Sequence, residues 1–581
     1  MSQKKLKKLR KLENIDLGVK SVESVSGIRE ILRKNWKFLL VLILGVVAIY
    51  FNSLWGGFVS DDYATVSQNS QVASITTAWT SGHYSFFVNL SKTVIAKVFG
   101  NQNPIPYHIF SLLVYLLICV LAFIFLSLFF GNVVVKVALV IFAVLPVHVE
   151  AISWISGIPY LLTSSLVLVC LINLVLFLIK KDKKYLFTLL FFLLIIFFTD
   201  RIRGFAFVLL SGLTLLSFQT KFKIKVNLLL VFSAILVATG ALILIGWPLI
   251  QTRIGSVNSG VNVSDSIFYD PFFQYPTAIP KYLQMVLFPT DLTLYHTMYV
   301  IPDWFNWLVL LTYLTAVVWF YFKDKRFFFA LAFVFVATAP SMAPVKVSWL
   351  VAERYVFLGS LGVALIFGLL SDRYWEKRKY LVVGILSAFV AAYSVRVILR
   401  NINWQTNHNL WVNTCQVSPN SHNAWNNIGD DYDKLSQYDN AVKGFGMSFA
   451  VKQNYADAYH NQANIFYKIG RLDLARKGYE QTLYYNPALY QTYLTLIQLD
   501  LVENNKEELL KHIYQLNQAK PNDLQVAYIT ATAYAKIGMI SEAKALSSSL
   551  YQQFPKIAEI KSLYDALQAT PESTNSGLLK K

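Results

Sequence analysis

Long apolar runs separated by short polar segments fill the chain up to about residue 400. A helix that crosses the hydrocarbon core of a bilayer needs about 20 mainly apolar residues. The shorter runs would have to be tilted, or shielded by neighbouring helices. The pattern predicts an all-helical, polytopic membrane unit with eleven spans, at residues 38–56, 109–130, 132–147, 160–180, 185–199, 204–218, 226–247, 302–322, 327–340, 355–371 and 379–399.

Basic clusters occupy alternate connections between the predicted spans. They are KKDKK at 180–184, KFKIK at 221–225, KDKR at 323–326 and DRYWEKRK at 372–379. Because Lys and Arg accumulate in cytoplasmic loops, these connections and the N-terminus are expected on the cytoplasmic side. The outer side then receives the loop after the first span, HVEAISWISG at 148–157, TDRIRG at 199–204, the segment 248–301, VAERY at 351–355 and everything after residue 400.

Two of the outer segments have a pattern of their own. Residues 57–108 mix apolar and polar side chains at roughly helical spacing, which predicts helices lying in the membrane interface. Residues 255–266, GSVNSGVNVSDS, are small, polar and without a pattern. We expect a mobile loop there, either a lid over a site or an inert connector.

A period of 34 residues is visible after residue 400. Pro487, Pro521 and Pro555 are 34 residues apart, and Pro419 stands two periods before Pro487. Other columns hold aromatic residues (Tyr432, Phe466 and Tyr534, with Asp500 as the exception) or small and aliphatic ones (Ala441, Ala475, Leu509 and Ala543; Gly429, Ala463, Ile497 and Ala531). Such columns are the tetratricopeptide pattern, whose helix pairs stack into a superhelix with a concave binding surface.

Composition agrees with a membrane unit followed by a repeat domain. The 581 residues are 55% hydrophobic and 15% charged, with a mean hydropathy of +0.46, which excludes one large soluble core. The net charge of +19 comes from clusters between spans and from the N-terminal tail, so membrane orientation explains it better than nucleic-acid binding. Three cysteines, Cys119, Cys170 and Cys415, exclude a disulfide framework.

Four domains follow from these patterns. Residues 1–37 are expected to be a basic cytoplasmic tail and not a signal peptide, because they contain no apolar core and no cleavage site. The membrane unit is predicted at 38–400, the repeats at 401–570 and a flexible tail at 571–581.

Candidate chemistry collects on the predicted outer side. Asp61 and Asp62 stand together in FVSDDYATV, just beyond the first span, where two carboxylates lose hydration unless they are used or stay in water. The alternative is a solvated turn. In a reaction with a lipid-linked phosphate donor, one of them could deprotonate an acceptor hydroxyl. The cations that could hold the phosphate leaving group are Arg201, Arg203, Lys281 and Arg354.

Structural roles remain open for several of these side chains. Arg201 and Arg203 could extend to the bilayer interface or pair with Asp200. Glu353 and Arg354 adjoin a span, so an ion pair between helices would explain them equally well.

His148 and Glu150 resemble a pair of metal ligands. Their spacing of two does not bring them onto one face of a helix, and no third ligand is evident. We therefore predict no metal site and no cofactor.

Six stretches, in this order along the chain, resemble the membrane glycosyltransferases of the GT-C class. The similarity is greatest to the branch that joins a multi-span transferase to tetratricopeptide repeats, the TMTC-type O-mannosyltransferases and their prokaryotic relatives. The stretches are FVSDDYATV, PYHIFSLLVYLL, LPVHVEAISWISGIPYLL, YLQMVLFPTDLTLYH, VAERYVFLGSLG and NWQTNHNLWVNTCQVSPNSHNAWNNIG. Together they span about residues 38–570.

The resemblance implies an inverting transferase that moves a sugar from a polyprenyl-phosphate donor to a hydroxyl of a protein on the outer face. It assigns the catalytic carboxylate to Asp61, with Asp62 as its neighbour. His148, Glu150, Glu353, Arg354 and Tyr355 also fall on motif positions. Where relatives tend to have a Lys-Glu pair before a Gly, this chain reads TDRIRG, so Arg201 or Arg203 would replace that lysine.

The expected partners are a polyprenyl-phosphate-linked sugar, a protein acceptor bound by the repeats, and membrane lipid, with no nucleic acid. Two other functions stay open, a catalytically degenerate membrane scaffold for the repeats and a transferase acting on glycolipid or envelope polysaccharide. Short loops and few outer cysteines favour a prokaryotic cytoplasmic membrane over an endoplasmic reticulum.

Overall fold

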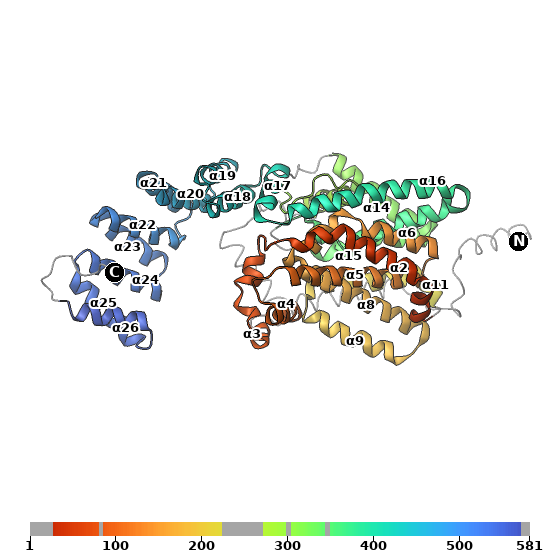
Figure 1. Ribbon diagram of the computed structural model, residues 1–581, viewed down its shortest axis with the longest axis horizontal. Coiled ribbons are helices and arrows are strands. Elements are labelled where there is room, and N and C mark those ends of the chain that lie inside the picture. The colour runs from red at the N-terminus through yellow and green to blue at the C-terminus, as the bar shows by residue number, and fades with distance from the viewer. Residues whose placement is uncertain (1–26, 81–84, 223–270, 298–303, 343–348, 571–581) are drawn as a thin grey trace, which may run out of the picture. The chain divides into compact units, whose positions relative to one another are not determined.

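The computed structural model describes residues 27–80, 85–222, 271–297, 304–342 and 349–570. Every regular element in these ranges is a helix, which confirms the predicted all-helical class (Figure 1). The chain forms two compact units, residues 1–418 and 419–581. The predicted span at 226–247 and the predicted loop at 255–266 lie outside the described residues.

Apolar helices make up most of the first unit. In the described ranges, seven are long and apolar enough to cross a membrane, or eight if the bent pair Asn132–Ala143 and Pro146–Ser153 is one span. The chain is therefore an integral membrane protein. The main helices are α2 (Ile28–Tyr50), α5 (Ile105–Ser127), α6 (Asn132–Ala143), α8 (Ile158–Lys180), α9 (Lys183–Phe197), α11 (Ala206–Phe222), α13 (Pro271–Leu287), α14 (Trp304–Lys323), α15 (Lys325–Thr338) and α16 (Ser360–Asn403).

The first helix is longer than the apolar run that predicted it. It begins at Ile28, ten residues before residue 38, and its first turns hold basic residues and the Glu30–Lys34 ion pair (2.5 Å). Lys and Arg are good helix formers, and a pair at i and i+4 supports a helix in water. The helix therefore continues beyond the apolar stretch.

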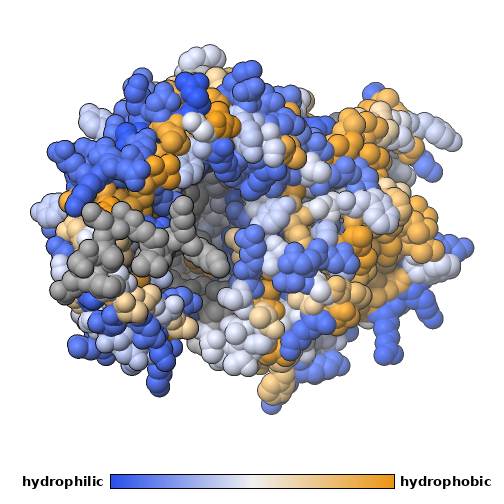
Figure 2. Space-filling view, turned by 60° about the vertical axis from the view of Figure 1, so that its left-hand side comes forward, coloured by the Kyte–Doolittle hydropathy of each residue, from blue (hydrophilic) through white to orange (hydrophobic). Residues whose placement is uncertain are grey.

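Large apolar side chains are exposed on the membrane helices. Trp304 and Phe322 on α14 are 75% and 77% exposed, and Phe187 on α9 is 67% exposed. Figure 2 shows hydrophobic surface gathered over this unit and mainly hydrophilic surface over the repeats. An apolar surface of this extent is stable against lipid and not against water.

Helix α16 contains two antiparallel legs. At Arg378 the backbone leaves helical geometry (φ −141°, ψ 38°). The rings of Phe367 and Phe389 lie 5.1 Å apart, whereas 22 residues of straight helix would separate them by roughly 33 Å. The chain therefore reverses at Arg378, so the residues of the spans predicted at 355–371 and 379–399 lie on different legs of α16.

Short helical segments lie at one end of the membrane unit in Figure 1. They are α3 (Ile75–Thr80), α4 (Phe86–Phe99) and α17 (Asn407–Val417). The loop after α2 is tied there to the chain that follows α16. The N–H of Gly57 donates to the carbonyl of Gln405 (2.8 Å), and the N–H of Ser60 donates to Oδ1 of Asn407 (2.8 Å). These bonds bring segments from opposite ends of the unit's sequence to the same place.

The second unit consists of helix pairs with the predicted period. Its helices are α18 (His422–Lys434), α19 (Tyr438–Val451), α20 (Ala456–Lys468), α21 (Leu472–Tyr485), α22 (Tyr490–Glu503), α23 (Lys506–Ala519), α24 (Leu524–Lys536), α25 (Ile540–Gln553) and α26 (Ala558–Gln568). Pro487, Pro521 and Pro555 each stand two residues after the second helix of a pair.

Small residues allow the two helices of a pair to approach closely. A Cβ atom on Gly444 would lie 2.9 Å from the Cα of Gly429, and one on Gly478 would lie 2.8 Å from the Cβ of Ala463. The column that contains Ala441 is fully buried in all four repeats. The columns recognised in the sequence are thus the helix crossings of the solenoid.

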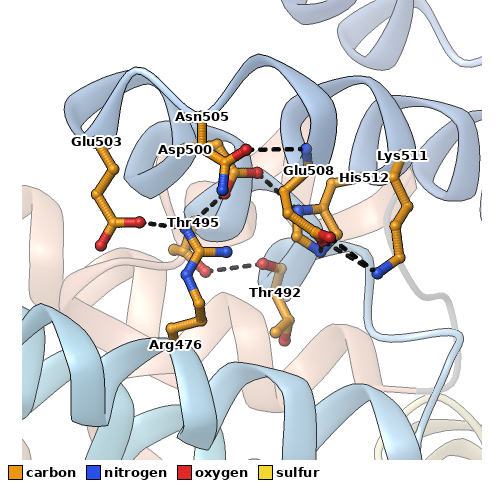
Figure 3. A network of polar contacts seen from close by, with 9 residues as sticks. All are labelled: Arg476, Thr492, Thr495, Asp500, Glu503, Asn505, Glu508, Lys511 and His512. Atoms are coloured by element: carbon orange, nitrogen blue, oxygen red, sulfur yellow. Dashed lines mark hydrogen bonds and ion pairs between the residues drawn. The ribbon is translucent and has the colours of Figure 1, made fainter.

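Asp500 is the one acidic residue in the aromatic column, and it is buried in a polar network (Figure 3). One carboxylate oxygen accepts from Nη2 of Arg476 (2.6 Å), and the other bonds to Nδ1 of His512 (2.7 Å). Arg476 belongs to the preceding repeat and also donates to Glu503 (2.6 Å). Charge pairing here replaces the aromatic packing of the other repeats.

We expect Asp500→Ala to destabilise the repeats by about 3 kcal/mol, because it leaves buried partners without their counter-charge. Hydrogen exchange of α21–α23 in the full chain would measure this loss. Asp473→Ala, which removes an exposed pair with Arg471 (3.6 Å), is the control and should cost less than about 0.5 kcal/mol. Equal protection in the two variants would contradict the role given to Asp500.

Candidate functional site

Asp62 joins the loop after α2 to the turn before α8. It is fully buried, and its Oδ1 accepts from the N–H (2.8 Å) and Oγ (2.6 Å) of Ser156, in the short helix η7 (Ile155–Gly157). Its Oδ2 accepts from the N–H of Val59 (3.1 Å). Burial raises the pKa of Asp62 to about 6, and the bonds from Ser156 and Val59 oppose that rise. The geometry is that of a residue that holds two loops together.

Asp61, next to it, has the opposite environment. Its side chain is exposed, and within the described residues it accepts no hydrogen bond and forms no ion pair. Surrounding protein still reduces its hydration and raises its pKa, while the positive charges of Arg354 and Lys92 lower it. Asp61 is thus an accessible carboxylate whose pKa responds to the charges of two cations.

Lys92 was not among the residues selected from the sequence. It lies on α4, is only 4% exposed, and donates from Nζ to the carbonyl of Thr65 (3.5 Å). Burial lowers the pKa of Lys92 to about 8, against the pull of Asp62 and Asp61. The buried positions Val88, Lys92 and Ile95 share one helical face, and this spacing is the signal that could have identified it.

A buried ion pair connects Glu150 with Arg354. Glu150 lies on α7 (Val149–Ser153), after the 56° bend that follows α6, and Arg354 lies in η10 (Glu353–Tyr355). The guanidinium donates Nη1–H to Oε1 of Glu150, and the backbone N–H of Arg354 donates to Oε2 (2.9 Å). Both carboxylate oxygens therefore bind a single residue, which fixes the position of Arg354.

Tyr160 brings the two arginines together. Its hydroxyl accepts from Nη2 of Arg203 (2.6 Å) and from Nε of Arg354 (3.2 Å), and its ring stacks on that of Tyr355 at 6.0 Å. Arg203 also pairs with Asp200, which caps α10 (Arg201–Gly204). One pocket between helices is lined by both arginines, both tyrosines, the hydroxyl residues Thr163, Ser164 and Ser341, and the apolar residues Val167, Ala206, Ala337, Pro340, Phe357 and Leu358.

His148 does not line this pocket. Its Nδ1 is bonded to the hydroxyl of Tyr115 (2.9 Å) and its Nε2 to Oγ of Ser360 (2.7 Å), and its ring is packed between Phe142 and Phe357. With both ring nitrogens bonded to protein, His148 holds helices together. His148 and Glu150, which resembled a pair of metal ligands in the sequence, thus bind different partners in the structure.

Glu353, the residue before Arg354, is buried and pairs with Nη2 of Arg400 (2.7 Å) near the end of α16. Burial raises the pKa of Glu353 to about 8, a rise that Arg400 opposes. Nε2 of His296, another residue not selected from the sequence, lies 3.9 Å from the Glu353 carboxylate. Burial lowers the pKa of His296 well below its usual value, and Lys281, Arg400 and Arg354 add to that effect.

Lys281 and Arg201 are not among the residues that line the pocket. Lys281, on α13, donates to Gln284 (3.1 Å) and lies 3.8 Å from Asp291. Its pKa is lowered by burial and partly restored by Asp291. The guanidinium of Arg201 stacks over the ring of Phe197 at 4.5 Å, and Arg201 does not line the pocket that contains Arg203.

Fold and site together describe an all-helical integral membrane protein that combines a multi-span unit with 34-residue helical repeats. No protein-family model matches the chain. Curated proteins do match the chain, and their names confirm its resemblance to TMTC-type proteins.

The protein O-mannosyl-transferase TMTC3 of Homo sapiens is 23% identical over 570 residues, which cover 84% of this chain and 61% of the relative. TMTC3 of Mus musculus is 23% identical over 508 residues, covering 77% and 54%. Tmtc1 of Drosophila melanogaster is 27% identical over 122 residues, covering 20% and 14%. The chain thus spans a little over half the length of the two mammalian relatives.

We expect Glu150→Ala to lower the stability of the membrane unit by about 3 kcal/mol, because Arg354 would stay buried without its counter-charge. The thermal unfolding midpoint of the full chain in detergent would show this loss. Glu30→Ala, which breaks an exposed pair with Lys34, should cost less than about 1 kcal/mol. A midpoint equal to that of Glu30→Ala would show that the Glu150–Arg354 pair does not hold the site together.

Proposed function

We propose that the protein is an inverting glycosyltransferase that moves a sugar, as an O-mannosyltransferase does, from a polyprenyl-phosphate donor to a hydroxyl of a protein acceptor. One observation carries the proposal. The accessible carboxylate of Asp61 lies near enough to Arg354 for the positive charge of that arginine to lower its pKa, and Arg354 shares the hydroxyl of Tyr160 with Arg203 in one pocket. Asp61 does not itself line this pocket, and in our proposal it acts from beside it. The relatives named as protein O-mannosyl-transferases support the choice of reaction.

The base of this reaction is Asp61. Its carboxylate removes the proton of the acceptor hydroxyl as that oxygen attacks the anomeric carbon of the sugar. Asp61 suits this role because it is accessible and has no partner within the described residues, whereas Asp62 has its oxygens committed to Ser156 and Val59. Asp62 keeps the loop in place, and the raised pKa of Asp61 makes it a stronger base than a free aspartate.

Arg203 and Arg354 receive the leaving group. The bond between the anomeric carbon and the phosphate oxygen breaks as the new glycosidic bond forms on the opposite face, and the electron pair stays on the phosphate. Each arginine pairs with a carboxylate, yet Nε of Arg203 and Nη2 of Arg354 donate no hydrogen bond within the described residues. Those N–H groups are available to phosphate oxygens.

The apolar wall of the pocket suits a lipid-linked donor. Val167, Ala206 and Ala337 come from α8, α11 and α15, which belong to or extend into membrane-spanning segments. A polyprenyl chain could therefore lie between helices while its phosphate meets the arginines. In this proposal the site faces outward, the N-terminus is cytoplasmic, the membrane is a prokaryotic cytoplasmic membrane, and the repeats recruit the acceptor.

We expect Asp61→Asn to lower transfer at least 100-fold, because an amide cannot accept the proton. Membranes with the variant would be given radiolabelled polyprenyl-phosphate mannose, and label on Ser and Thr of protein would be counted. Asp182→Asn, in the exposed connection before α9, is the control and should transfer normally. Normal transfer by Asp61→Asn would remove the proposed base, and no transfer by the wild-type chain would favour a non-catalytic scaffold.

The pH dependence of transfer should respond to Lys92. Asp61 acts when ionised, and the positive charge of Lys92 lowers its pKa. We expect Lys92→Met to raise that pKa and to move the acid limb of the pH–rate profile upward by up to about one unit. Lys97→Met, an exposed lysine on the same helix, should leave the limb in place. A limb that stays unmoved in Lys92→Met would exclude this electrostatic role.

A further inference from the structure

The pocket that contains Arg203 and Arg354 also holds a buried hydroxyl group without a partner. Thr163 lines this pocket and is only 3% exposed, and its Oγ1 makes no hydrogen bond within the described residues. A hydroxyl group that has lost water and gained no hydrogen bond destabilises the fold, so such groups are rare in proteins. The unpaired hydroxyl of Thr163 therefore calls for a partner from outside the protein.

Three other buried threonines of the membrane unit bond to their own helix. Oγ1 of Thr199, Thr214 and Thr338 donates to the carbonyl four residues before, at 2.7 Å in each case. This bond satisfies a hydroxyl group that has no other partner on an apolar helix. Thr163 does not make it, so its hydroxyl group is not used by α8.

Thr163 lies beside the group that joins the two arginines. It follows Tyr160 by three residues on α8, and side chains three residues apart lie on one face of a helix. The hydroxyl of Tyr160 accepts from Nη2 of Arg203 (2.6 Å) and from Nε of Arg354 (3.2 Å). All four residues line the same pocket, so a neutral donor and two guanidinium groups are available to one ligand.

These donors fit a phosphate group better than a carboxylate. Two guanidinium groups attract an anion and match its oxygens in pairs, and a phosphate group, unlike a carboxylate, has further oxygens that can accept from a hydroxyl. The same face of α8 continues to Val167, four residues after Thr163 and also in the pocket. Polar positions thus give way to an apolar one along this face, which matches a ligand that changes from phosphate to hydrocarbon.

We propose that Oγ1 of Thr163 donates a hydrogen bond to a phosphate oxygen of a lipid phosphate that binds beside Arg203 and Arg354. The inference rests on the proposed function only in making this phosphate the leaving group of the sugar donor. The hydrogen bond itself does not require transfer, so a polyprenyl phosphate without sugar should also form it. Without a ligand the unpaired hydroxyl lowers the stability of the protein, and binding of the phosphate removes that loss.

Three variants separate the hydroxyl from its surroundings. Thr163→Val removes Oγ1 and keeps the branched shape, whereas Thr163→Ser keeps the hydroxyl. Thr93→Val is the control, because Thr93 on α4 is also fully buried with an unpaired Oγ1 but does not line the pocket. The thermal unfolding midpoint of the full chain in detergent would be measured alone and with increasing short-chain polyprenyl phosphate, the corresponding polyprenol or inorganic phosphate.

We expect Thr163→Val to bind polyprenyl phosphate roughly tenfold more weakly, because a hydrogen bond to a charged oxygen is lost. Its midpoint without ligand should rise, because the variant no longer buries an unpaired hydroxyl. Thr163→Ser should bind within about twofold of the wild-type chain, since it keeps the donor. Thr93→Val should also have a raised midpoint, but with wild-type affinity.

Wild-type affinity in Thr163→Val would overturn the proposal and leave water as the partner of the hydroxyl. A lowered midpoint of this variant without ligand would also overturn it, because the hydroxyl would then have a partner in the protein. An equal rise of the wild-type midpoint with the polyprenol would exclude phosphate as the group that is recognised. An equal rise with inorganic phosphate would exclude a lipid-linked ligand.

The same measurements separate this inference from the proposed function. The Asp61→Asn chain should bind polyprenyl phosphate as the wild-type chain does, although it does not transfer sugar. If no chain transfers sugar but binding still depends on Thr163, the proposed reaction fails and the phosphate site stands. If Thr163→Val transfers sugar with an unchanged KM for the lipid-linked donor, this inference fails and the proposed reaction stands.

Discussion

The buried pairing of Glu150 with Arg354 is the interaction on which the membrane unit depends most. A buried carboxylate and a buried guanidinium are stable only when they are paired and hydrogen-bonded. Here the guanidinium of Arg354 pairs with one oxygen of Glu150, and the backbone N–H of Arg354 donates to the other oxygen. The pair joins the segment after the bend that follows α6 to the short helix before α16. It also sets the direction of Arg354, and Tyr160 extends the arrangement to Arg203. The same ion pair thus supports both the fold of the membrane unit and the position of the arginines in the site.

Adjacent residues can have opposite roles when a loop is held at one of them. Asp62 is buried and binds backbone and hydroxyl donors, whereas its neighbour Asp61 is exposed, and the charges of Arg354 and Lys92 lower its pKa. A second carboxylate beside the proposed base therefore serves as the anchor that keeps the first one accessible. The arrangement explains why the chain has two aspartates at this position although the proposed chemistry uses one.

The sequence was most informative where packing is periodic. The spans and the 34-residue columns could be predicted because lipid contact and helix crossing impose the same residue types at regular intervals. The two legs of α16 were separated correctly by the basic cluster at their turn. Contacts between distant segments have no such signature, which is why Lys92, Tyr160 and His296 were missed, and why His148 could not be separated from Glu150.

The buried Asp500 has a consequence for how the repeats could have evolved. Its charge is balanced by Arg476, which belongs to the repeat before, and by His512 within its own pair of helices. If Asp500 changed to the usual aromatic residue, Arg476 would lose the Asp500 carboxylate as a partner. If Arg476 changed first, Asp500 would lose the guanidinium of Arg476. The second and third repeats are therefore bound to change together. Placing another repeat between them would break the pair of Arg476 with Asp500.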